Sequence, residues 1–121
     1  MLINQTMIYT EKHNAKKPKG LVIVTHGIAL HSIYYRKLTE LINKGGYSVL
    51  LYDVRGHGKS QGIRGDIKDV KVFTNDLYQI VSEMKKENDL PIYLLGHSMG
   101  GVITNLYTTM YDNYDGSITL A

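Results

Sequence analysis

The stretch Gly96-His97-Ser98-Met99-Gly100 decides the fold of this chain. It is a G-x-S-x-G pentapeptide, and it directly follows the apolar run Ile92-Tyr93-Leu94-Leu95. A serine between two such glycines, where a buried strand turns into a helix, is typical of a nucleophile elbow. Side chains at positions 96 and 100 would collide with neighbouring backbone in so tight a turn, so glycine is expected there. Ser98 is therefore the candidate nucleophile.

The pattern around the pentapeptide predicts an α/β fold with a mostly parallel sheet flanked by helices, because apolar runs and amphipathic stretches alternate along the chain. Leu21–Thr25 is β-branched and lacks polar alternation, as expected of a strand buried on both faces. The predicted strands are residues 21–25, 47–53, 92–95 and 117–121. The predicted helices are residues 32–44, 70–86 and 99–111.

Apolar residues at helical spacing predict which face of each helix is buried. The faces comprise Tyr34, Leu38, Leu41 and Ile42 in the first helix, Val70, Phe73, Leu77, Ile80, Val81 and Met84 in the second, and Val102, Ile103, Leu106, Tyr107 and Met110 in the third.

Length and composition indicate a single domain, with 121 residues that are 43% hydrophobic and 21% charged. The formal charge of +3 reflects four lysines clustered before the first strong strand, and without aromatic interleaving this favours a solvated loop over a nucleic-acid site. The chain has no cysteine, no signal-like N-terminus and no apolar run near the roughly 20 residues of a membrane span. We therefore expect no nucleic-acid partner, no integral membrane segment and a cytoplasmic location.

Three motifs together carry a resemblance to a known family. They are His26-Gly27 after one strand, residues 53–62 (DVRGHGKSQG) after the next, and Gly96-His97-Ser98-Met99-Gly100-Gly101. In this order the motifs resemble the N-terminal half of α/β-hydrolases of the monoacylglycerol lipase and lysophospholipase type, a group also described as serine aminopeptidase-like. The resemblance runs from about Lys19 to Ala121.

The resemblance implies a fold with strand order 1-2-4-3-5-6-7-8, in which the four predicted strands are strands 3, 4, 5 and 6. Residues 2–10 are too few for a full first hairpin, so strand 1 is expected to be shortened or absent. Residues 1–121 would then form an incomplete hydrolase domain that ends after strand 6. The lid and the C-terminal half would lie beyond Ala121.

The resemblance also assigns roles around Ser98. The two oxyanion donors would be the backbone N–H groups of Met99 and Ile28, each worth about 3 kcal/mol to the transition state. His26, Gly27, Gly96 and Gly100 would support the motif.

The family places its triad acid and histidine after the serine, but only 121 − 98 = 23 residues follow Ser98 here. We interpret His57 and His97 as packing or loop-fixing residues, and His31 could line the entrance to an acyl site. Asp112 and Asp115 fall in the return loop, at the amino edge of the sheet. No residue of the chain is a convincing triad acid or base.

Metal and cofactor sites have little support in the sequence. The five histidines lack H-x-x-x-H and H-E-x-x-H spacing, and no G-x-G-x-x-G or G-K-[ST] motif opens a helix after a strand. We expect no metal and no cofactor.

Three functions remain open at this point. The first is a serine hydrolase for carboxylic esters of the monoacylglycerol or lysophospholipid kind, with the isolated chain inactive because its triad is incomplete. The second is a non-catalytic half-domain that pairs with another chain through the edge strand 117–121. The third is an aminopeptidase that uses the same elbow.

Overall fold

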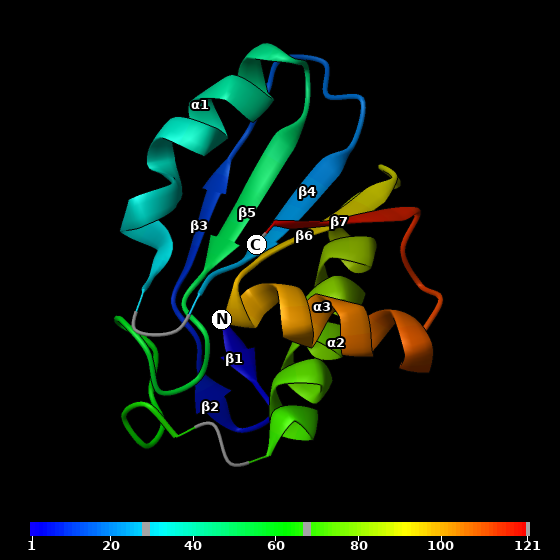
Figure 1. Ribbon diagram of the computed structural model, residues 1–121. Coiled ribbons are helices and arrows are strands. Elements are labelled where there is room, and N and C mark those ends of the chain that lie inside the picture. The colour runs from blue at the N-terminus through cyan, green and yellow to red at the C-terminus, as the bar shows by residue number, and fades with distance from the viewer. Residues whose placement is uncertain (28–29, 67–68, 121) are drawn as a thin grey trace.

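The computed structural model describes residues 1–27, 30–66 and 69–120, and a five-stranded sheet runs through their middle (Figure 1). The strand order is β3-β5-β4-β6-β7. The strands are β3 (Thr10–His13), β4 (Leu21–Thr25), β5 (Ser48–Tyr52), β6 (Ile92–His97) and β7 (Gly116–Leu120). Neighbours among β4 to β7 pair in parallel and only β3 is antiparallel, which confirms a mostly parallel sheet in which the four predicted strands have the order 4-3-5-6.

The N-terminal segment holds more structure than the sequence predicted. β1 (Leu2–Ile3) and β2 (Thr6–Met7) form a short hairpin outside the main sheet, in line with a shortened first hairpin. β3 was missed because Thr10-Glu11-Lys12-His13 is polar, as suits an edge strand that no apolar run marks. It pairs with β5 from Thr10 opposite Tyr52 to His13 opposite Val49.

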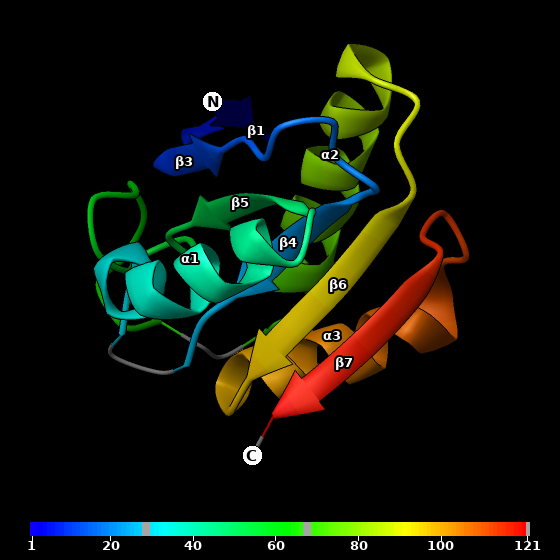
Figure 2. The same cartoon turned by 90° about the horizontal axis from the view of Figure 1, so that it is seen from above.

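Helices cover both faces of the sheet (Figures 1 and 2). The 3-10 turn η1 (Ser32–Tyr35) and α1 (Arg36–Lys44) lie on one face, while α2 (Val70–Glu87) and α3 (Met99–Met110) lie on the other. Asp69 caps α2 by accepting a hydrogen bond from the Lys71 N–H at 3.0 Å. This arrangement gives two cores, one on each side of β4, β5 and β6.

Two of the three predicted helix faces were wrong in part. The α2 face is buried as predicted, apart from a partly exposed Val70. In α3, however, Val102 and Met110 are exposed, and the buried side is formed by Gly100, Gly101, Ile103, Thr104 and Tyr107. The glycines allow the first turn of α3 to lie directly on the sheet, which rotates the helix away from its most apolar stripe. On the other face of the sheet, Tyr34 and Leu41 are exposed where Tyr35 and Thr39 are buried.

The face of the sheet beside α1 is incompletely covered. A mainly apolar hollow of about 430 Å³ lies there, lined by residues of β4, α1 and β6 and by Ile118 of β7. No helix within the described ranges is both long and apolar enough to cross a bilayer.

Candidate active site

The parallel pairing of β4 with β6 brings two of the sequence motifs to the same edge of the sheet. Thr25 lies opposite Gly96, so His26-Gly27 and His97-Ser98 leave the sheet side by side. In open α/β sheets the carboxyl ends of the strands form the ligand-binding crevice. The candidate site is therefore built where β4 and β6 end.

Ser98 has the backbone conformation of an elbow. Its φ of 57° and ψ of −116° lie in a region that non-glycine residues rarely adopt, at a cost of about 1–3 kcal/mol. The residue lies between β6 and α3 and is exposed. The strained turn therefore holds the candidate nucleophile out of the sheet and open to solvent.

The two glycines of the pentapeptide allow a close backbone approach. A Cβ atom on Gly100 would lie 1.9 Å from the carbonyl oxygen of Thr25, and one on Gly96 would lie 2.2 Å from the carbonyl oxygen of Gly100. Neither contact is possible for real atoms. Glycine at both positions avoids the collision with backbone that the sequence predicted, and at Gly100 it lets α3 start directly against the end of β4.

The loop after β4 lies against the nucleophile. A Cβ on Gly27 would lie 3.2 Å from the Cβ of Ser98, so the backbone here passes close to the candidate reaction centre. On the other side, Met99 opens α3, and the first N–H groups of a helix have no acceptor within it. Ile28, the second proposed oxyanion donor, lies outside the described residues.

His26 ties the end of β4 to the loop after β5. Its Nε2 accepts a hydrogen bond from the Val54 N–H at 2.8 Å, and its Nδ1 lies 2.7 Å from the Gly27 carbonyl oxygen. An accepting Nε2 leaves the proton on Nδ1, so the ring is neutral. Burial lowers the pKa of His26 to about 4, against the opposing effect of the Gly27 carbonyl. His26 is therefore a fixed structural tie and not a base.

The glycine-rich loop after β5 is organised by a buried carboxylate. Asp53 accepts hydrogen bonds from the N–H groups of Ser32, at 2.7 Å, and Lys59, at 2.9 Å. It thus joins the start of η1 to the 53–62 motif. In the same motif the buried ring of His57 has its Nδ1 3.1 Å from the Arg55 carbonyl and packs 5.4 Å from the ring of His26. These contacts agree with a loop-fixing role for His57.

Arg55 anchors this loop to α2. Its guanidinium donates to both carboxylate oxygens of the buried Asp76, at 2.8 and 2.9 Å. Asn4 adds a third donor to the same carboxylate at 3.1 Å. The ion pair raises the pKa of Arg55, so this guanidinium remains charged. The N-terminal hairpin, the motif loop and α2 are joined at one point.

No acid or base of the described chain contacts the Ser98 hydroxyl. The Nδ1 of His97 bonds instead to the Tyr35 hydroxyl at 2.8 Å. Asp115 lies at the opposite edge of the sheet, where its carboxylate accepts from the Ile92 N–H at the start of β6. Across residues 1–27, 30–66 and 69–120, no group of three His, Asp or Glu side chains is placed to hold a metal ion.

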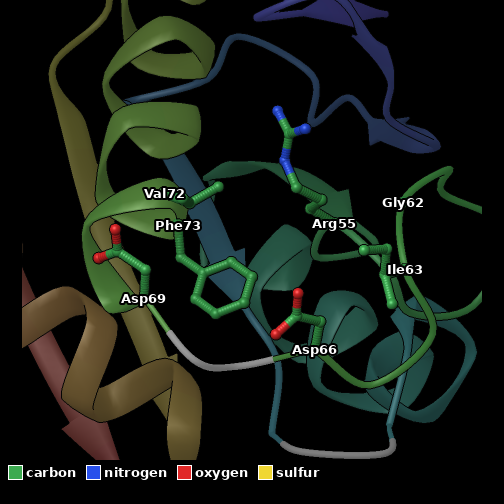
Figure 3. A pocket seen from close by; sticks show the side chains of 7 residues that line it. All are labelled: Arg55, Gly62, Ile63, Asp66, Asp69, Val72 and Phe73. Carbon is green, nitrogen blue, oxygen red and sulfur yellow. The ribbon is translucent and has the colours of Figure 1, made fainter.

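A separate hollow of about 260 Å³ lies between the glycine-rich loop and the start of α2 (Figure 3). Its walls come from Arg55, from the loop residues Gly62, Ile63 and Asp66, and from Asp69, Val72 and Phe73 at the start of α2. Ser98 does not line it.

Sequence reasoning missed two residues of the site region, Tyr35 and Asp76. Tyr34 and Tyr35 are adjacent, and no sequence motif shows which of the two is buried at the site. Asp76 lies in the middle of α2 and belongs to no motif. Only the tertiary contacts distinguish them.

Comparison with known proteins identifies the family. The sequence profile described as "Serine aminopeptidase, S33" matches residues 16–121. The chain belongs to this family. Rat monoglyceride lipase is 40% identical to this S33 chain over 90 residues, which cover 74% of the chain and 30% of the lipase.

Solved structures identify the fold. The monoacylglycerol lipase of Paleococcus ferrophilus superposes with a TM-score of 0.80 at 33% identity, over 93% of this S33 chain and 42% of that one. The α/β hydrolase GrgF from Penicillium sp. sh18 gives a TM-score of 0.89 at 23% identity, over 96% and 42%. The fold is thus that of the α/β-hydrolases. The chain spans 30% to 38% of the length of the curated lipases that it matches.

Proposed function

We propose that this chain supplies the nucleophile half of a serine hydrolase acting on carboxylic esters of the monoacylglycerol or lysophospholipid kind. The observation that carries the proposal is the strained, exposed Ser98, with the backbone of Gly27 against it. Matches to proteins named as monoglyceride lipases, and to one named as a phospholipase, support this substrate class. Residues 1–121 would be the N-terminal part of the hydrolase domain.

In the proposed reaction, the Ser98 hydroxyl oxygen attacks the acyl carbonyl while a histidine from outside these residues takes its proton. The oxyanion is bound by the N–H groups of Met99 and Ile28. The leaving alcohol takes the proton from the histidine, and water then hydrolyses the acyl-enzyme to fatty acid and free serine. The chain alone lacks the base and is expected to show little or no turnover.

The test is fatty-acid release from a monoacylglycerol by this chain, extended with any in-frame sequence that follows codon 121. Release that is lost in Ser98→Ala supports the proposal. Downstream sequence without an Asp and a His at the ends of later strands would contradict it. An aminoacyl anilide assayed in parallel tests the alternative, aminopeptidase activity, which the family description favours.

A non-catalytic role remains the second candidate, because β7 exposes an apolar edge. Ile118 and Leu120 are 56% and 43% exposed, and within the described sheet β7 pairs only with β6. Such an edge can add a strand from another chain. A folded circular dichroism spectrum without fluorophosphonate labelling of Ser98 would favour this role.

The cytoplasmic location stays a prediction, which fractionation of cells expressing the tagged chain tests.

A further inference from the structure

Tyr35 lies between the two loops of the candidate site. It ends η1, is only 7% exposed, and packs with Val24 and Leu95 in the core beside α1. Its hydroxyl oxygen is 3.0 Å from the Gly27 amide nitrogen and 2.8 Å from His97 Nδ1. One hydroxyl thus contacts the loop after β4 and the elbow after β6.

The chemistry of these groups fixes the direction of the first hydrogen bond, and burial indicates the direction of the second. A backbone N–H can only donate, so the Tyr35 oxygen accepts from Gly27. Tyr35 is buried, so its O–H needs an acceptor, and His97 Nδ1 is the acceptor that its described contacts provide. This direction places the ring proton of His97 on Nε2. The result is a directed chain from Gly27 N–H through the Tyr35 hydroxyl to the His97 ring.

We propose that the Tyr35 hydroxyl is a positioning group that fixes the oxyanion loop to the nucleophile elbow. Each of its two partners immediately precedes a proposed catalytic residue. Gly27 precedes the proposed oxyanion donor Ile28, and His97 precedes the candidate nucleophile Ser98. The Gly27 N–H is itself occupied and is not an oxyanion donor. The catalytic meaning of this bridge rests on the proposed function, whereas the bridge itself does not.

Gly27 is held on both sides of its Cα. Tyr35 binds its N–H, and the His26 ring binds its carbonyl oxygen at 2.7 Å. That carbonyl belongs to the planar peptide unit that carries the next N–H, the proposed oxyanion donor. Removing the Tyr35 hydroxyl alone should free the Gly27 N–H while the Tyr35 ring stays packed in the core.

Tyr35→Phe in the 121-residue chain tests the proposal by NMR, with Tyr34→Phe as the matched control. Tyr34 is its exposed neighbour, with 65% of its surface accessible and its ring packed edge-on against His31. In Tyr35→Phe we expect amide hydrogen exchange at Gly27 to accelerate about tenfold or more, because the N–H loses its acceptor. The ¹⁵N resonance of His97 Nδ1 should move downfield as it loses its donor. Tyr34→Phe should change neither.

Unchanged Gly27 exchange and an unchanged His97 ring in a folded Tyr35→Phe variant would overturn the proposal. If that variant does not fold, the unaltered chain still decides. Long-range ¹H–¹⁵N spectra must show the His97 proton on Nε2, and a proton on Nδ1 would overturn the proposed direction of the bridge. None of these readouts needs turnover, so failure of ester hydrolysis would count against the proposed function and not against the bridge.

Discussion

At the scale of single residues, two neighbouring glycines of α3 face different surroundings. A Cβ on Gly100 would meet the Thr25 carbonyl oxygen at 1.9 Å, whereas the nearest atom to a Cβ on Gly101 lies 3.6 Å away. An alanine at either position changes helix propensity in the same way, but only an alanine at Gly100 would collide with the end of β4. Comparing the two variants therefore measures the effect of the collision.

Gly100→Ala is expected to lower the free energy of unfolding by more than 3 kcal/mol or to prevent folding, because backbone must move to admit the methyl group. Gly101→Ala should be neutral or stabilising by up to about 1 kcal/mol, since alanine favours the helix. Urea unfolding followed by circular dichroism measures both. Equal losses in the two variants would contradict the assigned packing.

His26 makes stability depend on pH. Its pKa is about 4 in the folded protein, below its ordinary value of 6.5, so between these values the unfolded chain binds a proton that the folded chain does not. The free energy of unfolding should therefore be highest above pH 6.5 and fall as the pH drops toward 4, by about 3 kcal/mol in total. His26→Gln should flatten this slope.

Urea unfolding between pH 4.5 and 7 isolates this effect from Glu11. Burial would raise the pKa of Glu11, but hydrogen bonds from Tyr9, Arg36 and His13 outweigh it and lower the pKa to about 2. Stability from Glu11 is thus lost only as the pH falls from its ordinary value of 4.5 toward 2. A slope in His26→Gln as steep as in the unaltered chain would rule out His26 as its source.

Among the elements, buried polar contacts join segments that are distant in the sequence. The Arg55–Asp76 pair connects the motif loop to α2, and Asn4 brings in the hairpin of β1 and β2. Asp76 is buried and Arg55 is partly buried, so removing one partner leaves the other with less water around it than a surface charge has.

Asp76→Asn is expected to lower the free energy of unfolding by about 3 kcal/mol, because Arg55 loses its counter-charge in a partly buried place. The exposed pair between Lys86 and Glu83 is the control, and Lys86→Ala should cost less than about 0.5 kcal/mol. Urea titration of both variants gives the comparison. Similar costs would mean that burial of the Arg55–Asp76 pair does not matter.

The strands of the parallel core could be predicted from the sequence because burial on both faces leaves a continuous apolar run. The α2 face could be predicted because burial along one stripe leaves apolar residues at helical spacing. The elbow could be predicted because its strain demands glycines at fixed spacing. β3 and the buried face of α3 could not, since a polar edge strand has no apolar pattern and packing around Gly100 overrides the apolar stripe. The Tyr35 bridge leaves no local pattern at all.

For the molecule as a whole, the side of β7 that pairs with no strand of the described sheet should control self-association. Ile118 is 56% exposed on this strand and borders the apolar hollow beside α1. Lysine on an edge strand opposes pairing with another chain, because its charge would have to be buried.

We expect the unaltered chain to associate with rising concentration and Ile118→Lys to shift it toward monomer, as measured by sedimentation velocity. Leu41→Lys is the matched control, since Leu41 is 65% exposed but lies on α1, away from the edge. A Leu41→Lys variant that dissociates equally would indicate general apolar contact and not pairing at β7. A chain that stays monomeric throughout would rule out the edge as an interface.

The contact of Gly100 with Thr25 also has a kinetic consequence. These residues are far apart in sequence, and they meet only when β6 has paired with β4 across the whole intervening β5–α2 segment. Pairings between distant segments close large loops, which costs conformational entropy and slows folding. Until then nothing holds Ser98 at its positive φ. We therefore expect the reactive geometry of the serine to form only once β4 and β6 have paired, and a molecule in which they have not paired to present an ordinary hydroxyl.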